Sequence, residues 1–202
     1  MVKKTKKKRK GFSLSEEYKD SWKYIKESKK FIYASIGIFF FFVFFAYFIP
    51  APQFIYTKII SFIQDLVKQT AGMSQMQLIQ FIISNNLKST LLVIVFGTIL
   101  GIFPLISAIA NGYMLGFVSL LSVKADGFLT LWRILPHGIF ELPAVFISLG
   151  LGLKMGTFIF QKKKLQSFRD YMIKSLKVFL LIIIPLLLVA GIIEGTLIAL
   201  LS

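Results

Sequence analysis

Long apolar runs separated by short polar segments dominate this chain. Stretches with few or no charges cover residues 31–49, 89–123, 134–160 and 176–201, and about 20 such residues suffice for a helix to cross a bilayer. A single helix over 89–123 would measure about 52 Å against a hydrocarbon core of about 30 Å, and Gly101 and Pro104 offer a break. The pattern therefore predicts five transmembrane helices, at about 31–49, 87–103, 104–123, 134–160 and 176–201, with a re-entrant pair at 89–123 as the alternative.

Two further segments have amphipathic patterns. Residues 53–86 mix apolar positions at helical spacing with charges, and we expect two helices on the outer interface, the second beginning at Ser74 and ending at Asn85-Asn86. Residues 1–30 combine a basic tail with an interfacial helix, for which Ser13 and Glu16 have the spacing of a capping box. The expected fold class is an all-α polytopic membrane bundle, formed by residues 31–202, with additional amphipathic interfacial helices.

The charge distribution gives an orientation. The net charge is +15, but 12 of the 24 Lys and Arg residues lie within residues 1–30 and six lie within 161–177. Basic segments beside apolar spans are typical of cytoplasmic loops that face anionic lipid. Five spans then place the N-terminus and Lys162–Lys164 in the cytoplasm of a cell-membrane protein, with the C-terminus extracytoplasmic. We expect no binding of nucleic acid, and we expect the inner leaflet to be bound by Lys3, Lys4, Lys6, Lys7, Lys8, Arg9 and Lys10.

Pairs of glycines four residues apart occur in each of spans two to five. Such pairs let helix backbones approach closely inside a membrane. They predict a compact core of four helices, with the Phe-rich first span at its edge and a homo-oligomer as a further possibility. The expected helix-packing residues are Gly97, Gly101, Gly112, Gly116, Gly152, Gly156, Gly191 and Gly195.

Polar residues inside the apolar spans are the candidate functional groups. His137, the only histidine, and Glu141 lie one helical turn apart, and Glu194 lies in the last span. With the orientation above, these three residues converge with Asn85, Asn86 and Asn111 in the outer half of the bundle. The cluster has three interpretations: hydrogen bonds that fix helix register, a solvated pocket for a ligand or proton, or a metal or catalytic centre.

Sequence motifs for enzymatic chemistry are missing. The chain has no His-Glu-x-x-His zinc motif, no Gly-x-Ser-x-Gly elbow, no phosphate-binding loop and no cysteine. We therefore expect no enzyme activity, no resident metal and no cofactor.

The polar residues also carry a family resemblance. Asn85-Asn86, Asn111-Gly112 with Gly116, the block Pro136–Ala144 and Ile193-Glu194 are similar to the stage II sporulation protein M family of multi-pass membrane proteins. The resemblance covers about residues 75–200 and implies five spans without an established catalytic activity. In endospore formers, the family member belongs to an engulfment complex, where it binds two extracytoplasmic partners that degrade peptidoglycan.

The residues and the resemblance together favour a membrane scaffold that organises extracytoplasmic or membrane-bound partners in envelope or membrane remodelling. The first alternative is a small transporter or proton-coupled permease that uses His137, Glu141 and Glu194. The second is an intramembrane metal-dependent hydrolase.

Overall fold

The computed structural model describes residues 13–133 and 135–201, apart from the side chains of residues 132–137 and 201. Within these residues the regular elements are helical, and five helices are long and apolar enough to cross a membrane. The expected all-α fold with five spans is therefore confirmed. The α-helices are α1 (Leu14–Glu27), α2 (Lys29–Phe48), α3 (Gln53–Thr70), α4 (Gln75–Phe96), α5 (Ile102–Asp126), α6 (Leu135–Gly156), α7 (Lys164–Val178) and α8 (Ile184–Leu201).

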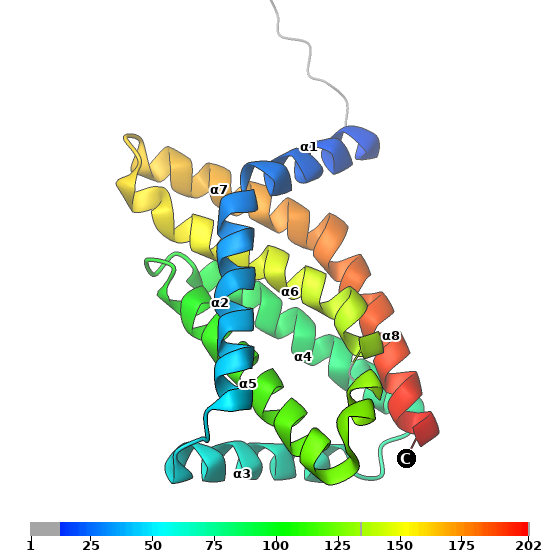
Figure 1. Ribbon diagram of the computed structural model, residues 1–202. Coiled ribbons are helices and arrows are strands. Elements are labelled where there is room, and N and C mark those ends of the chain that lie inside the picture. Colours follow the sequence, from blue (N-terminus) through cyan, green and yellow to red (C-terminus); the bar gives the residue numbers. More distant parts are fainter. Residues whose placement is uncertain (1–12, 134, 202) are drawn as a thin grey trace, which may run out of the picture.

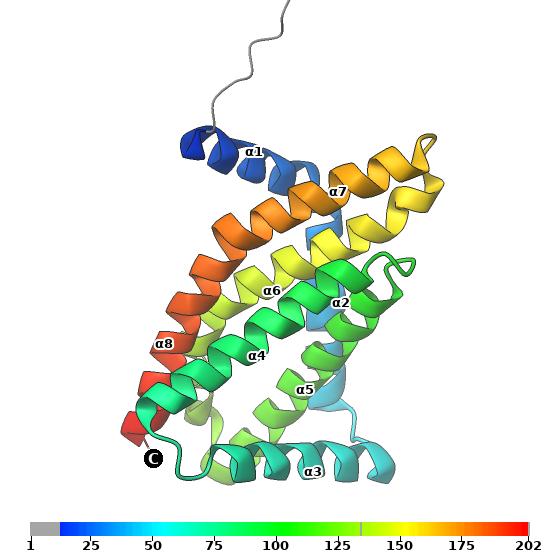
Figure 2. The ribbon, with the colours of Figure 1, turned by 180° about the vertical axis from the view of Figure 1, so that it is seen from behind.

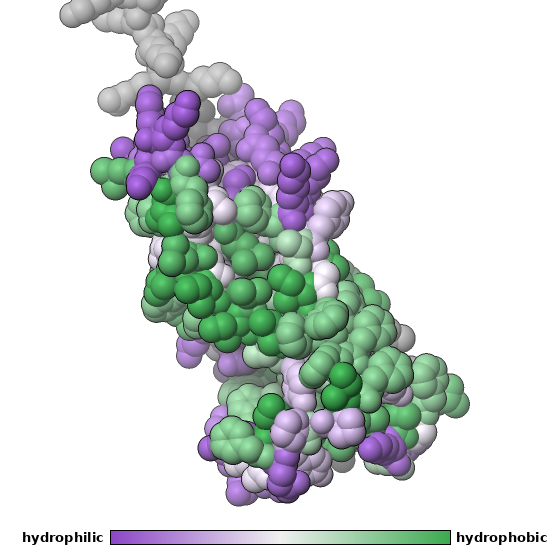
Figure 3. Space-filling model, turned by 60° about the vertical axis from the view of Figure 1, so that its left-hand side comes forward, coloured by the Kyte–Doolittle hydropathy of each residue, from purple (hydrophilic) through white to green (hydrophobic). Residues whose placement is uncertain are grey.

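The helices form one bundle with a polar region at each end. Helices α1 and α7 lie across one end, here called the lysine-rich end, whereas α3 lies across the opposite end, here called the α3 end (Figures 1 and 2). On the face shown in Figure 3, the surface between them is a broad apolar belt, and hydrophilic side chains are concentrated beyond it at both ends. This distribution matches a protein that spans a bilayer, with amphipathic helices at its two surfaces.

Residues 89–123 belong to two full-length helices rather than to a re-entrant pair. Helices α4 and α5 contain 22 and 25 residues, which gives lengths of about 33 and 37 Å. The turn between them contains Gly101 with a φ angle of 70°, and it lies against Gly156 near the lysine-rich end of α6. Both helices thus run between the two ends of the bundle.

Helix α4 corrects the expected boundary of the second span. We predicted a short helix ending at Asn85-Asn86 and a separate span at 87–103, but one unbroken helix covers Gln75–Phe96. The start at Ser74 was predicted correctly, because Ser74 and Gln77 form a capping box. Asn85, Asn86 and Lys88 are therefore inside a spanning helix rather than at its outer start. At α1, by contrast, Ser13 is the N-cap but its side chain makes no capping hydrogen bond.

Glycines mark the places where the helix backbones touch. An added Cβ at Gly112 or Gly116 of α5 would lie 2.3 or 2.1 Å from the carbonyl oxygens of Phe39 and Val43 in α2. The first span is the least buried of the five, yet it packs directly on α5. The sequence pattern missed this because α2 supplies large residues to the crossing and only α5 supplies small ones.

The last span begins inside a longer helix. α7 continues into a π-helical turn at Phe179–Ile183 and then into α8. Pro185 lies two residues after the end of this turn, and a proline ring clashes with the carbonyl four residues earlier in a regular α-helix. The wider turn accommodates that ring, so the chain passes from the surface helix α7 into the span without a break.

Candidate functional site

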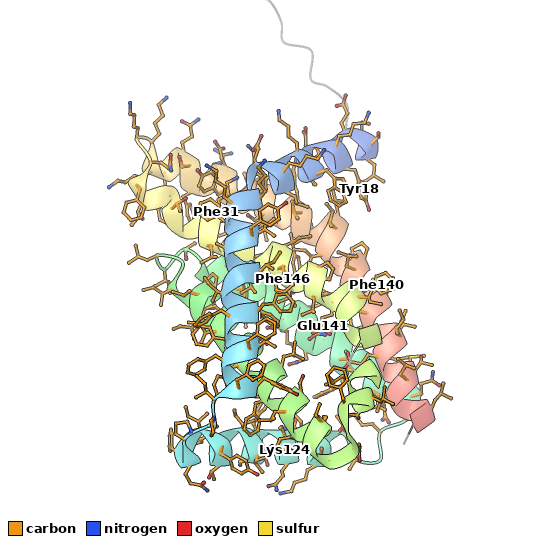
Figure 4. All side chains as sticks on the ribbon, in the orientation of Figure 1. Tyr18, Phe31, Lys124, Phe140, Glu141 and Phe146 are labelled. Carbon is orange, nitrogen blue, oxygen red and sulfur yellow. The ribbon has the colours of Figure 1, made fainter. Side chains whose placement is uncertain are left out.

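Glu141 lies on the stripe of α6 that packs against α4. The stripe continues through Ser148 to Gly152 at helical spacing, and an added Cβ at Gly152 would lie 2.5 Å from the carbonyl oxygen of Val93 in α4. Ser148 is buried and its hydroxyl donates to the carbonyl oxygen of Ala144 at 2.8 Å. Glu141 is half-buried on this stripe of α6 (Figure 4).

Glu194 reaches the same helix from α8. It lies between Gly191 and Gly195, whose added Cβ atoms would meet the side chains of Ile83 and Ile79 at 2.4 and 2.5 Å. The glutamate is half-buried at this crossing. Helices α6 and α8 therefore each direct one carboxylate toward α4, and neither carboxylate is without an interaction. Such pairing is expected, because an unpaired charge within a membrane is costly.

The other predicted members of the cluster do not all join these carboxylates. Asn86 is half-buried, whereas Asn85 is exposed on the outside of α4. Asn111 is also exposed, and its amide donates to the carbonyl oxygen of Ser107 on its own helix at 2.7 Å. The side chain of His137 lies outside the described residues, although the backbone of α6 places it one turn before Glu141. Neither Asn85 nor Asn111 is in the bundle interior.

The described residues contain no group of three His, Cys, Asp or Glu side chains close enough to hold a metal ion. The side chain of His137 is not among these residues, and the predicted membrane-surface residues Lys3–Lys10 likewise lie outside the described part of the chain.

A second polar cluster, which the sequence pattern did not predict, surrounds Lys154 near the lysine-rich end of α6. Lys154 is only 8% exposed, and its ammonium group donates to the hydroxyl of Ser28 at 3.0 Å. The same nitrogen lies 3.9 Å from the centre of the Tyr24 ring and 5.4 Å from that of Tyr171. A cation over an aromatic face contributes from about 0.5 to 2 kcal/mol, with the larger values when water is excluded.

This cluster attaches the surface helix α1 to the bundle. Ser28 joins α1 to α2, and its hydroxyl donates to the carbonyl oxygen of Tyr24 at 2.7 Å. Burial raises the pKa of the Tyr24 phenol, and the hydroxyl of Ser175 in α7 partly opposes that shift. An ion pair between Lys177 and Glu17 provides a further link between α7 and α1. The sequence signal for this cluster was available, since Lys154 is a charged residue within the apolar stretch 134–160.

A shallow cleft of about 330 Å³ lies between α1 and α7 beside this cluster. Ser21, Tyr24 and Ile173 line it together with three lysines and three carboxylates, whose charges balance. The lysines are Lys23, Lys174 and Lys177, and the carboxylates are Asp20, Glu27 and Asp170.

Comparison with known proteins agrees with the resemblance drawn from the polar residues. The family model of stage II sporulation protein M matches residues 35–197. An uncharacterized protein of Methanocaldococcus jannaschii is 40% identical over 115 residues, which cover 54% of this chain and 52% of that protein. The chain thus spans about half the length of this curated relative. No solved structure gives a significant match.

Proposed function

The chain belongs to the stage II sporulation protein M family, and on that premise we propose that this membrane protein is a non-enzymatic scaffold for partner proteins in envelope or membrane remodelling. The observation that carries the proposal is the position of helix α3 and its exposed polar side. This helix lies across the end of the bundle, outside its spanning helices (Figure 1). Its exposed polar residues lie on the side opposite to the one that packs on the bundle.

The tight packing of the bundle supports a role as a fixed platform. Added Cβ atoms at Gly97, Gly152 and Gly156 would lie within 2.2–2.5 Å of backbone atoms of neighbouring helices. Helices in such close contact resist sliding, because any shift must separate backbones along the whole crossing. A scaffold needs this rigidity, whereas alternating access requires helices to move against one another.

One face of α3 holds the helix on this platform. Buried Ile59 and half-buried Ile63 pack with Ala46 of α2 and Phe117 of α5. The contacts use the apolar side of an amphipathic helix, as expected for a helix at a membrane interface.

The opposite face of α3 is available to a partner. Exposed side chains recur there at intervals of three and four residues and form what we call the α3 stripe: Phe54, Lys58, Ser61, Asp65 and Lys68. Phe54 is 73% exposed, and the ammonium group of Lys58 lies 5.8 Å from the centre of its ring. Aromatic residues beside cations are frequent energetic centres of protein interfaces. In the predicted orientation, the stripe faces the extracytoplasmic side.

Site-specific photo-crosslinking in cells tests this proposal. A photoreactive amino acid at Ser61 in the full chain should crosslink to a discrete protein, which is then identified after purification in mild detergent. The double substitution Phe54→Ala with Lys58→Glu should abolish that product while the protein remains folded. Position 62 is the matched control, because Phe62 is exposed but lies about 100° around α3 from Ser61, outside the stripe. Crosslinks that form equally at both positions, or that survive the double substitution, would contradict a docking role for the stripe.

A further inference from the structure

Helix α4 carries a polar face that points away from the rest of the bundle. Its apolar side packs on α8 through Ile79 and Ile83 and on α6 through Val93. The opposite side carries five exposed polar residues, which we call the α4 stripe: Gln77, Gln80, Ser84, Asn85 and Lys88. Together with Met73 and Phe81, the stripe lines a shallow groove of about 410 Å³.

The register between α4 and α8 places this stripe within the apolar zone. Ile83 meets Gly191 and Ile79 meets Gly195, so the two helices run antiparallel, and Asn85 is level with Val189. Val189 lies near the middle of the apolar segment between Lys177 and Leu201 and is itself 43% exposed. Helix α8 therefore presents apolar side chains to lipid at the same depth at which α4 presents amides, a hydroxyl and a lysine.

Exposing Lys88 to lipid at this depth is energetically unfavourable when the chain has no partner. It lies eight residues from one end of α4 and thirteen from the other, which corresponds to about 12 and 20 Å along the helix. Among the residues that the structure describes, it forms no ion pair. Ionisable residues in spanning helices usually face a bundle interior or a water-filled cavity, and a central lysine costs about 2.5–3.5 kcal/mol on insertion scales.

A second copy of the chain does not supply the missing charge. Within the described spans, the carboxylates are Glu141 and Glu194, which are half-buried toward α4, and Asp126 at the end of α5. A copy related by a two-fold axis would place another lysine-bearing stripe opposite the first one. Like charges at this depth repel, so self-association through α4 leaves both lysines unsatisfied.

We propose that the α4 stripe is the docking site for a spanning helix of a different membrane protein, one that carries a carboxylate near the bilayer centre and amide or hydroxyl groups toward the α3 end. The carboxylate pairs with Lys88, and the amides of Asn85, Gln80 and Gln77 donate to and accept from the partner. Ser84 is small enough for the two backbones to approach closely. The inference rests on the proposed scaffold function and names its intramembrane partner class.

A pair of designed peptides tests this charge requirement directly. Both are leucine- and alanine-rich transmembrane helices, one with a central Glu and the other with Leu at that position. Because the Glu is central, it reaches the same depth in either orientation. The chain has no cysteine, so a single Gln166→Cys substitution at an exposed site accepts a donor fluorophore. Energy transfer to acceptor-labelled peptide is then titrated with the full-length protein in neutral-lipid vesicles.

The Glu peptide should bind the unsubstituted stripe at least tenfold more tightly than the Leu peptide. Lys88→Leu should remove this preference without unfolding the protein, because the side chain faces outward. Lys88→Glu should restore it for a peptide with a central Lys. Leu92→Ala, one turn further along the exposed side of α4, is the matched control and should leave the preference unchanged.

Three outcomes would overturn the inference. Equal binding of both peptides would show that lipid or water satisfies the stripe. Strong energy transfer between two labelled copies, lost with Asn85→Leu, would assign the stripe to self-association. A preference for the Glu peptide that survives Lys88→Leu would place the binding site elsewhere. None of these results bears on crosslinking at the α3 stripe, so failure of this inference and failure of the scaffold function are distinguishable.

Discussion

The substitution Gly152→Ala tests whether backbone contact at the glycine crossings stabilises the bundle. Gly152 lies in α6 where α4 and α5 both approach it. An alanine Cβ there would lie 2.5 Å from the carbonyl oxygen of Val93 and 2.6 Å from Cγ of Pro104, whereas ordinary contacts begin near 3.4 Å. Backbone and a proline ring cannot rotate out of the way, so helices α4 and α5 must both retreat by about 0.8–0.9 Å.

The size of the effect follows from two opposing terms. Overpacking of this kind costs about 1–3 kcal/mol, while alanine gains about 0.5–1 kcal/mol over glycine inside a helix. Gly37→Ala in α2 isolates the second term, because an added Cβ at Gly37 meets nothing within 4 Å. The helix-forming gain cancels between the two variants. Gly152→Ala should therefore be less stable than Gly37→Ala by about 1–3 kcal/mol.

Equilibrium unfolding of both variants in mixed micelles, followed by tryptophan fluorescence, measures this difference. Gly37→Ala should be at least as stable as the unsubstituted protein. If Gly152→Ala unfolds at the same denaturant fraction as Gly37→Ala, the crossing is loose and the argument from backbone contact is wrong.

Four further predictions concern orientation, the tail and the buried polar groups. A cysteine at Lys163 should be labelled by a membrane-impermeant reagent only from the cytoplasmic side, and labelling from outside alone would reverse the topology. A peptide of residues 1–30 should bind anionic vesicles with an affinity that falls as salt rises, whereas equal binding to neutral vesicles would contradict a surface role. Glu194→Ala should lower the melting temperature more than Glu194→Gln, because the amide keeps hydrogen-bonding capacity, and equal losses would argue against a hydrogen-bonded role. Burial raises the pKa of Tyr24 above its ordinary value of about 10. The unfolded chain therefore ionises first as the pH rises past 10, and the folded protein loses stability there. In melting experiments, Tyr24→Phe should lose less stability between pH 9 and pH 11 than the unsubstituted protein.

The number of spans could be predicted from the sequence because hydrocarbon thickness and basic loops constrain it strongly. The continuity of α4 through residues 85–88 could not, because Asn85, Asn86 and Lys88 interrupt the apolar run where the helix continues. That continuity depends on Ile79 and Ile83 packing against glycines of α8, and a contact between segments more than 100 residues apart leaves no local signal. Polar residues in a span mark a helix end only when no neighbouring helix holds that segment of the chain in place.

The candidate site was predicted in part for a similar reason. The predicted topology placed Glu141 and Glu194 together in the bundle, and both are half-buried on sides of α6 and α8 that carry packing glycines. Spacing did not predict that Asn85 and Asn111 face outward, because depth along a helix says nothing about its rotation. The Lys154 cluster was missed because its partners Ser28 and Tyr24 come from a surface helix.

The contrast between the charged groups in the spans gives the strongest argument for an external partner. Lys154 is buried, yet a hydroxyl and an aromatic ring satisfy it within the chain. Glu141 and Glu194 are turned toward α4, and neither is without an interaction. Lys88 differs from all three, since it is exposed, near mid-depth and aligned with four other polar residues. A chain that satisfies its other buried charges internally, but directs this one outward along a groove, has the arrangement expected when a second protein supplies the counter-charge.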